Sequence, residues 1–359
     1  MARRFASSDV SSSVLPDVSP NVSPVVPSSS ASESMVSDSY GRQFQYLRLS
    51  ITEVCNFRCT YCLPNGYKKC ASYEEPLTIS EIENLVSAFA GLGFWKVRLT
   101  GGEPSVRRDL VEIVERVTAV PGIRFVALST NGLKLQEQAE SLLRAGLQGL
   151  NLSLDSLDPA VFLKMTGRSE HQKIMDGIDR ALSLGFRLLK INVVLMKGLN
   201  ETSLSEFMEW VRTRQVSVRF IELMRTGGNK ELFERHYLSG RVVSDFLEQS
   251  GWQLRERSQG DGPAVEYHHP DFLGRMGIIA PYSKDFCKTC NRLRVSSTGK
   301  LRLCLFGDGD LSLRPLLQNS DDRGELMARV RHLLSGKSVS HSLQEGKYGN
   351  TWNLSAIGG

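Results

Sequence analysis

The chain has 359 residues, of which 41% are hydrophobic, and a formal net charge of +5. That length supplies enough apolar material for one large α/β domain or two domains of ordinary size. No run of about 18 apolar residues occurs, which argues against a membrane-spanning helix, and a charge this small selects neither a nucleic acid nor a small anion as the partner.

Residues 1–44 are rich in Ser, Val and Pro and lack the continuous apolar stretch of a secretory signal. Such a composition buries too little apolar surface to fold alone, so we expect a disordered tail. The seven cysteines are an odd number in a chain without an export signal. They favour metal–thiolate chemistry in a reducing cytoplasm over a disulfide framework.

From residue 45 the sequence alternates between short apolar runs and longer amphipathic stretches. This alternation predicts six strands with five helices between them, and hence right-handed βαβ units with a parallel sheet. Polar and glycine-rich residues, Asp155 among them, follow the strands, where parallel α/β folds place their sites. The expected strands are 45–51, 96–99, 124–129, 149–154, 188–194 and 216–223, and the expected helices are 79–90, 110–118, 136–145, 174–184 and 204–213.

The pattern is less regular after residue 235. We therefore divide the chain into the tail at 1–44, a barrel-like region at 45–235 and a C-terminal region at 236–359. In the last region, residues 292–295 and 300–303 predict a hairpin around Thr298-Gly299, and residues 323–334 predict a helix. The expected fold class is α/β, an incomplete (βα)6 parallel barrel with a C-terminal extension that carries the remaining cysteines.

Cys55, Cys59 and Cys62 follow the first predicted strand with the spacing C-x3-C-x2-C. Such short spacings let one loop bring several thiolates to a single metal centre. Three cysteines leave one corner of a [4Fe–4S] cluster open, and a cofactor or substrate can bind iron there. The alternative is a zinc site whose fourth ligand is Cys70 or a histidine.

Cys287 and Cys290 form a C-x2-C pair, and Cys304 lies beyond the turn of the predicted hairpin. The hairpin returns the chain to the same place, so three thiolates again converge and one corner stays open. A zinc site completed by His268 or His269 is the alternative.

Arg292 and Arg294 alternate along the strand that follows Cys290, so their side chains face the same side. Two guanidinium groups beside an open iron position predict a pocket for an anionic ligand that also binds metal. On a strand without such neighbours, alternating arginines are more often solvated.

The first cysteine loop, with Tyr61 before its last cysteine, and Gly101-Gly102-Glu103-Pro104 after a strand resemble the two motifs of the radical S-adenosylmethionine superfamily. Within it, residues 48–359 resemble the GTP 3′,8-cyclase family of molybdenum cofactor biosynthesis, including the terminal Gly358-Gly359. The segments that carry this resemblance are LRLSITEVCNFRCTYCLP, VRLTGGEP, LSTNG, NLSLDSLD, KINVVLMKGLN, RFIELM and FCKTCNRLRV.

The resemblance implies a lyase that converts GTP to (8S)-3′,8-cyclo-7,8-dihydroguanosine 5′-triphosphate, with an adenosyl radical that abstracts hydrogen from C3′. It also implies two [4Fe–4S] clusters, S-adenosylmethionine, an electron donor, a cytoplasmic homodimer, a functional link to cyclic pyranopterin monophosphate synthase, and no role for nucleic acid or membrane. The implied ligands are Cys55, Cys59 and Cys62 for the first cluster; Cys287, Cys290 and Cys304 for the second; Tyr61, Gly102, Ser153 and Met224 for S-adenosylmethionine; and Arg48, Lys96, Arg98, Ser129, Lys190, Arg219, Arg292, Leu293 and Arg294 for GTP.

Two other interpretations stay open at this point. A radical enzyme that modifies peptides would share the first motif but would carry more C-terminal cysteines. A zinc-stabilised nucleic-acid-binding module would need a dense basic face with stacking aromatic residues, whereas the cations here are dispersed and aromatic residues make up 8% of the chain. The roles of Cys70 and Arg225 do not follow from the sequence.

Overall fold

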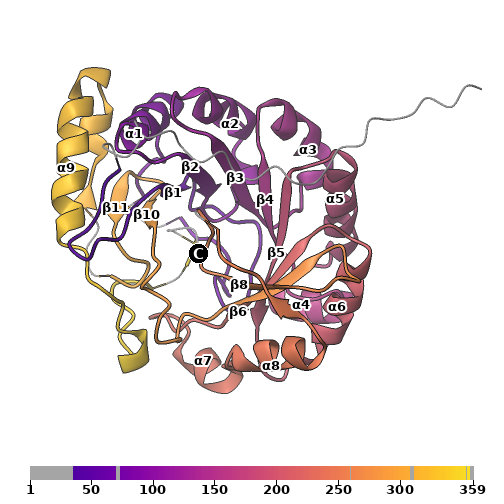
Figure 1. Cartoon of the computed structure of the whole chain (residues 1–359). Coiled ribbons are helices and arrows are strands. Elements are labelled where there is room, and N and C mark those ends of the chain that lie inside the picture. The colour runs from indigo at the N-terminus through magenta and orange to yellow at the C-terminus, as the bar shows by residue number, and fades with distance from the viewer. Residues whose placement is uncertain (1–34, 70–72, 259, 308–310, 353, 356–359) are drawn as a thin grey trace, which may run out of the picture. The chain divides into compact units, whose positions relative to one another are not determined.

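One curved sheet organises the part of the chain that the structure describes, which is residues 35–69, 73–258, 260–307, 311–352 and 354–355 of a computed structural model (Figure 1). Its strands are β1 (Tyr46–Ser50), β2 (Lys96–Thr100), β3 (Phe125–Thr130), β4 (Gly149–Ser153), β5 (Leu188–Leu195), β6 (Ser217–Glu222), β7 (Gln253–Leu254), β8 (Val265–His268), β9 (Arg275–Ile279), β10 (Arg292–Val295), β11 (Lys300–Arg302) and β12 (Leu311–Ser312). The helices are α1 (Ile79–Gly91), α2 (Leu110–Ala119), α3 (Leu135–Arg144), α4 (Pro159–Thr166), α5 (His171–Ser183), α6 (Leu204–Arg212), α7 (Lys230–His236), α8 (Arg241–Gln249) and α9 (Arg323–Ser335).

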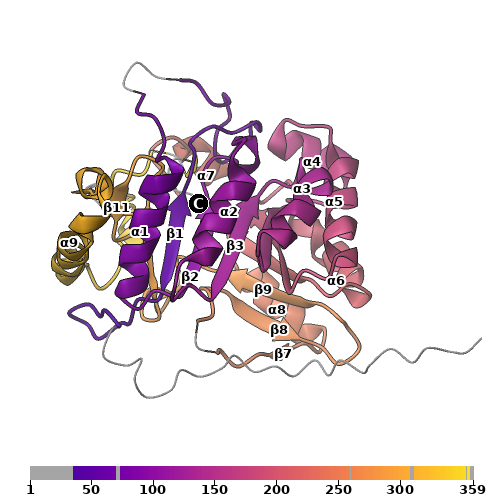
Figure 2. The same ribbon diagram turned by 90° about the horizontal axis from the view of Figure 1, so that it is seen from above.

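The predicted α/β fold with an incomplete parallel barrel is confirmed. The sheet order is β12-β11-β10-β1-β2-β3-β4-β5-β6-β9-β8-β7, and among the described strands no pairing joins the two ends. Helices α1, α2, α3, α5 and α6 line the outside of the curved sheet in both views (Figures 1 and 2). The six predicted strands and five predicted helices are all present, with bounds within three residues of those expected.

The parallel part of the sheet is larger than the six strands expected from the sequence. β9 pairs in parallel with β6, and β10 pairs in parallel with β1, so eight consecutive strands run in one direction. The prediction missed these pairings because both strands are short and neither follows a helix directly. The hairpin of β10 and β11 is antiparallel, as predicted.

The end of the expected tail requires a correction. Residues 35–44 are placed, with Val36 and Phe44 buried and a bridge between Ser37 and Gln43. Residues 1–34, the rest of that prediction, lie outside the described residues. The division at residue 235 stays a prediction; it falls within the last turn of α7.

Helix α4 was not predicted, although its boundary signals are present in the sequence. Asp158 caps it by accepting hydrogen bonds from the backbone N–H groups of Ala160 and Val161, and Pro159 occupies its first turn. Gly167 ends it in the left-handed conformation, with φ of 68°. These signals enclose only eight residues, too few for a periodic pattern to stand out.

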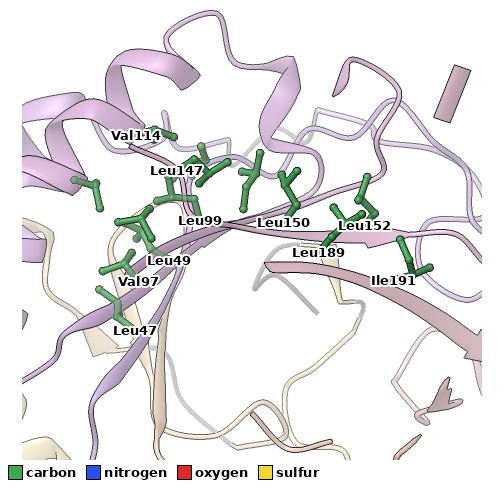
Figure 3. Packing of buried hydrophobic residues seen from close by; sticks show 14 of the residues in the cluster. Leu47, Leu49, Val97, Leu99, Val114, Leu147, Leu150, Leu152, Leu189 and Ile191 are labelled. Atoms are coloured by element: carbon green, nitrogen blue, oxygen red, sulfur yellow. The ribbon is translucent and has the colours of Figure 1, made fainter. Parts of the chain in front are cut away.

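Alternation along the strands separates the two faces of the sheet. Apolar side chains such as Leu47, Leu49, Val97 and Leu99 are fully buried in the core that the sheet forms with the helices (Figure 3). The residues between them therefore point to the inside of the barrel. Among the described residues, no helix has both the length and the apolar character needed to cross a membrane.

Candidate active site

The first cysteine loop follows β1 and is held in place by the end of α4. The backbone N–H of Arg58 donates to the carbonyl of Thr166 at 3.1 Å, and that of Thr60 donates to the carbonyl of Met165 at 2.9 Å. Within the loop, the N–H of Cys62 donates to the carbonyl of Cys59 at 3.0 Å. The helix that the sequence did not reveal is thus the support of the predicted cluster loop.

The Gly101-Gly102 turn after β2 lies directly against the same loop. The N–H of Gly102 donates to the carbonyl of Thr52 at 2.9 Å, and the N–H of Glu103 donates to the carbonyl of Val54 at 2.8 Å. A Cβ atom on Gly101 or Gly102 would collide with these carbonyls, and Gly101 has a φ of 145°. Glycine is required here by the close approach of the two backbones.

The Glu103 carboxylate joins the ends of β2 and β3 rather than pointing into open space. It accepts hydrogen bonds from the backbone N–H groups of Ser105 at 2.9 Å and Asn131 at 2.6 Å, and from the Thr130 hydroxyl at 2.7 Å. Burial raises the pKa of Glu103, and these hydrogen bonds oppose the rise. The carboxylate thereby fixes the carboxyl ends of β2 and β3 relative to each other.

A cavity of about 170 Å³ lies between the first cysteine loop and the carboxyl ends of β2 to β6. All three cysteines line it, so the structure brings together the thiols that the spacing predicted. The four residues predicted for S-adenosylmethionine also line it, as does Ser129, which was predicted for GTP. The residues are Cys55, Cys59, Cys62, Tyr61, Gly102, Ser153, Met224 and Ser129, with Leu354 and Ser355 near the C-terminus.

Asp155 also lines this cavity, although no role beyond its place after a strand was predicted for it. Its carboxylate accepts a hydrogen bond of 2.8 Å from the Tyr61 hydroxyl and one of 2.9 Å from the N–H of Val194. Burial raises the pKa of Asp155 to about 6, against the effect of these two hydrogen bonds. Asp155 therefore holds the aromatic ring that precedes Cys62.

The predicted GTP residues form rows across the inner face of the barrel. Arg48 on β1 lies opposite Arg294 on β10 and Arg98 on β2 in the strand register. Neighbouring strands lie about 4.8 Å apart, so this row places three guanidinium groups side by side. The next row places Tyr46 between Arg292 and Lys96.

Lys190 and Arg219 extend this cationic lining along β5 and β6. Burial lowers the pKa of Lys190 well below that of an ordinary lysine, and the charges of Arg219 and Lys96 add to the effect. Burial, followed by the charge of Arg294, likewise lowers the pKa of Arg48, although a guanidinium stays protonated near neutral pH. So many buried cations repel one another, and the arrangement suits a ligand with several negative charges.

The surroundings of Lys96 and Leu293 limit what these two predicted GTP residues can offer a ligand. The Lys96 ammonium donates to the carbonyl of Gly260 at 3.0 Å, so one of its donors is used by the protein. The Leu293 side chain is fully buried in the hydrophobic core, between two inward-facing arginines of its strand. Only the backbone of Leu293 is left for contact with a ligand.

The second cysteine group lies at the start of β10 and beyond β11. The N–H of Cys290 donates to the carbonyl of Cys287 at 3.1 Å, and the hairpin returns the chain to Cys304. Burial would raise the pKa of Cys290, but the charges of Arg292 and Lys337 lower it. A half-buried thiol such as that of Cys290, whose thiolate form is favoured by nearby cations, suits an iron–sulfur centre.

The histidines proposed as zinc ligands do not accompany these cysteines. His269 packs against Trp252 and Phe272, and His268 pairs with Gln253 at the far end of the sheet. The histidine that contacts the group is His341, which the sequence analysis missed. Burial would raise the pKa of Cys287, but hydrogen bonds with His341 lower it to about 6.

Arg225 contacts the segment near the C-terminus. Its guanidinium lies 5.8 Å from the centre of the Tyr348 ring, at a distance that permits a cation–π interaction. The adjacent N–H groups of Gly227 and Gly228 each donate at 3.0 Å, to the carbonyls of Thr351 and Trp352. The loop after β6 thereby holds the segment that leads to Leu354 and Ser355 in the cavity, while Cys70 and Gly358-Gly359 lie outside the described residues.

Family models and curated relatives agree with these observations. Residues 49–211 match the Radical SAM superfamily, and residues 216–343 match Molybdenum Cofactor Synthesis C. A GTP 3',8-cyclase of Vibrio cholerae serotype O1 is 51% identical over 90% of this chain and 97% of its own length. The GTP 3',8-cyclase of Synechococcus elongatus is also 51% identical, over 90% of this chain and 99% of its own length.

A solved structure supports the fold independently of close sequence similarity. Streptococcus suis SuiB bound to S-adenosylmethionine superimposes with a TM-score of 0.51 at 14% identity, covering 88% of this chain and 75% of that chain. At this identity the likeness shows the fold alone.

Proposed function

The chain belongs to the GTP 3′,8-cyclase family, and from that membership we propose which residues hold its substrate and cofactors. It is a radical S-adenosylmethionine lyase with two [4Fe–4S] clusters that converts GTP to (8S)-3′,8-cyclo-7,8-dihydroguanosine 5′-triphosphate, the first step of molybdenum cofactor biosynthesis. When bound, the first cluster and S-adenosylmethionine supply the radical that removes hydrogen from C3′ of the ribose.

The S-adenosylmethionine site is proposed at the rim cavity, which is the cavity between the first cysteine loop and the carboxyl ends of β2 to β6. Cys55, Cys59 and Cys62 would bind three irons of the first cluster, which leaves the fourth iron for the methionine end of the cofactor. The contacts with the rest of the cofactor are assigned to Tyr61, Gly102, Ser153 and Met224. The support is that all seven residues line one cavity.

Cys287, Cys290 and Cys304 are proposed to hold the second cluster, which would bind the guanine of the substrate. The support is that Arg292 and Arg294 directly follow Cys290 on β10 and alternate with the buried Leu293, so that both point to the inside of the barrel. Their guanidinium groups would bind the base or phosphates in a geometry that a lysine could not reproduce.

The triphosphate is proposed to lie along the inner cationic rows. The supporting observation is that cations from five strands, β10, β1 and β2 on one side and β5 and β6 on the other, face one interior and are buried or half-buried there, where charge-assisted hydrogen bonds are strongest. Ser129 lines the rim cavity and would contact the substrate where it approaches the adenosyl group. The proposed GTP residues are Arg48, Lys96, Arg98, Ser129, Lys190, Arg219, Arg292, Leu293 and Arg294, the last but one through its backbone.

This placement explains how the residues favour ring closure. Holding the triphosphate and the base at once leaves the ribose between the two cysteine groups, with C3′ near the rim cavity and C8 facing C3′. The barrel contributes proximity and orientation, because the bond formed joins two atoms of the same molecule.

Several features follow from family membership rather than from the described contacts. We propose that residues 45–235 carry the radical chemistry and residues 236–359 the second cluster, that the enzyme is a cytoplasmic homodimer, and that a separate donor supplies the electron. The product would pass to cyclic pyranopterin monophosphate synthase. No nucleic acid or membrane is required.

The decisive experiment is anaerobic incubation of the reconstituted protein with GTP, S-adenosylmethionine and dithionite. Mass analysis should show the cyclised nucleotide together with 5′-deoxyadenosine, and neither should form when reductant is omitted. Protein with about eight irons per chain that releases 5′-deoxyadenosine but leaves GTP unchanged would contradict the proposed substrate.

A further inference from the structure

Glu266 is a buried carboxylate in the middle of the cationic interior. It lies on β8, one of the antiparallel strands that extend the sheet beyond β9, and only 7% of its surface is exposed. Burial would raise the pKa of Glu266, but the charges of Arg219 and Lys190 lower it to about 2. It is therefore ionised at neutral pH.

The contacts of Glu266 are directed at one guanidinium group. Its Oε1 atom accepts hydrogen bonds from Nε of Arg219 at 2.9 Å and also from Nη2, so the Nε–Nη2 edge of that arginine is engaged. The Ser217 hydroxyl, on the same face of β6, donates to the same oxygen at 2.8 Å. Nε of Arg255 donates to the other oxygen at 3.2 Å.

The opposite edge of Arg219 is left for another acceptor. A Cβ atom built on Gly262 would lie 3.9 Å from Nη1, so the glycine leaves space beside that edge. Arg219 contributes to the electrostatic environment of Lys96, Arg98 and Lys190, which places its charge within the proposed triphosphate site. A guanidinium held by one edge presents the other in a fixed direction.

We propose that Glu266 is a positioning residue that fixes Arg219 so that its Nη1 edge points at the triphosphate of GTP. Ser217 and Arg255 fix Glu266 in turn. This inference rests on the proposed GTP site and adds to it a residue that does not itself touch the substrate, since a carboxylate repels phosphate.

Two effects of Glu266 oppose each other, which makes the inference testable. As a negative charge it weakens the positive potential of the interior and disfavours a polyanion. As an anchor it removes the rotational freedom of a long side chain before GTP binds, which favours binding. A neutral amide of the same shape removes the charge and weakens the anchor, so the direction of the change in affinity identifies the dominant role.

The test uses the reconstituted Glu266→Gln enzyme under anaerobic conditions. The Kd for GTP is measured by equilibrium dialysis without S-adenosylmethionine, and KM and kcat are measured with S-adenosylmethionine present. We expect Kd and KM for GTP to rise about tenfold, the loss of roughly one charge-assisted hydrogen bond, with kcat within about twofold of wild type. Inorganic tripolyphosphate should lose affinity in parallel. Tighter binding or unchanged binding would overturn the inference.

A double-mutant cycle separates positioning from general damage. In an Arg219→Met background the Glu266→Gln change should cause no further rise in Kd, because the arginine to be positioned is gone and only the unfavourable charge of Glu266 is removed. If the losses of GTP affinity in the two single variants add up in the double variant, Glu266 does not act through Arg219. Glu266→Asp, which keeps the charge, should recover part of the affinity.

Controls cover folding and the proposed function itself. Glu248→Gln removes an exposed carboxylate that accepts a hydrogen bond from Tyr267, and it should leave Kd unchanged. If Glu266→Gln fails to fold, Arg255→Met tests the same chain of contacts and should weaken GTP binding about threefold; no change would count against the inference. Wild-type enzyme that binds no GTP would instead refute the proposed substrate.

Discussion

Nη1 of Arg42 donates a hydrogen bond of 3.1 Å to the backbone carbonyl of Cys287. The same guanidinium donates to the carbonyls of Val339 at 2.6 Å and Ser338 at 2.8 Å, and it pairs with the buried Asp38 carboxylate. One side chain from the segment before β1 thus joins the second cysteine pair to the segment after α9. The loop proposed to hold the second cluster is therefore tied to a residue that precedes the barrel.

The substitution Arg42→Lys should loosen this loop selectively. A lysine keeps the ion pair with Asp38, but one ammonium cannot span three carbonyls as the guanidinium does. We expect iron content to fall from about eight towards about four per chain, while reductive cleavage of S-adenosylmethionine persists. Arg144→Lys, at an exposed pair with Glu140, is the matched control. Full iron content in Arg42→Lys would show that the carbonyl contacts are dispensable.

The substitutions Cys59→Ala and Cys304→Ala should separate the two clusters. Each removes one thiolate ligand, so each variant should retain about four irons per chain. Cys59→Ala should abolish 5′-deoxyadenosine formation, whereas Cys304→Ala should still form it without cyclising GTP. The measurement is iron and sulfide analysis with chromatography of the nucleosides. Cleavage by Cys59→Ala would mean that the first site is misassigned.

The substitutions Arg292→Ala and Arg294→Ala should weaken GTP binding. Each removes a charge-assisted contact with a ligand group, which corresponds to about a tenfold or greater loss of affinity. Both clusters should persist, because neither arginine is a ligand. Anaerobic equilibrium dialysis and electron paramagnetic resonance would measure the two properties on the same sample. Wild-type affinity in both variants would refute their assignment to the substrate.

The affinity for GTP should decrease at alkaline pH earlier than an ordinary lysine would allow. Burial lowers the folded-state pKa of Lys190 well below 10.5, so its charge is lost at a lower pH than that of an ordinary lysine as the pH rises. Loss of that charge removes an attraction for phosphate. Lys190→Arg should extend tight binding to higher pH, because a guanidinium does not titrate there.

The affinity of Lys190→Arg for GTP should be compared with that of the wild type at each pH between 7 and 10. Titration of GTP itself affects both proteins equally, so it cancels in this comparison. Parallel profiles for the two proteins would show that Lys190 does not control binding in this range. Lys96 has a lowered pKa too, chiefly through burial, so a residual decrease in the variant is expected.

The sequence predicted those features that depend on local pattern. The strands β1 to β6 follow from their apolar runs, and the inward direction of Arg292 and Arg294 follows from alternation along a strand. Cysteine spacing predicted that Cys55, Cys59 and Cys62 share one short loop, and these three residues line one cavity. That Cys287, Cys290 and Cys304 hold a second cluster stays a prediction. The rim cavity then followed from the parallel direction of the strands.

Features that depend on distant pairing could not be predicted in this way. Arg42 meets Cys287 across 245 positions of the chain, and Glu266 meets Arg219 across 47 positions. Neither charged residue carries a local signal that separates it from a solvated side chain. Their partners are set by the pairing of β10 with β1 and of β9 with β6, which joins segments far apart in the sequence.

These same pairings have a consequence for synthesis of the protein. The outer edges of β1 and β6 are covered by β10 and β9, whose residues, 275–295, leave the ribosome late. Until then both edges expose unpaired backbone groups that can capture strands of other nascent chains. A chain truncated near residue 235 by a premature stop codon would therefore keep both strand edges exposed. We expect such a fragment to aggregate or be degraded rather than to retain part of the activity.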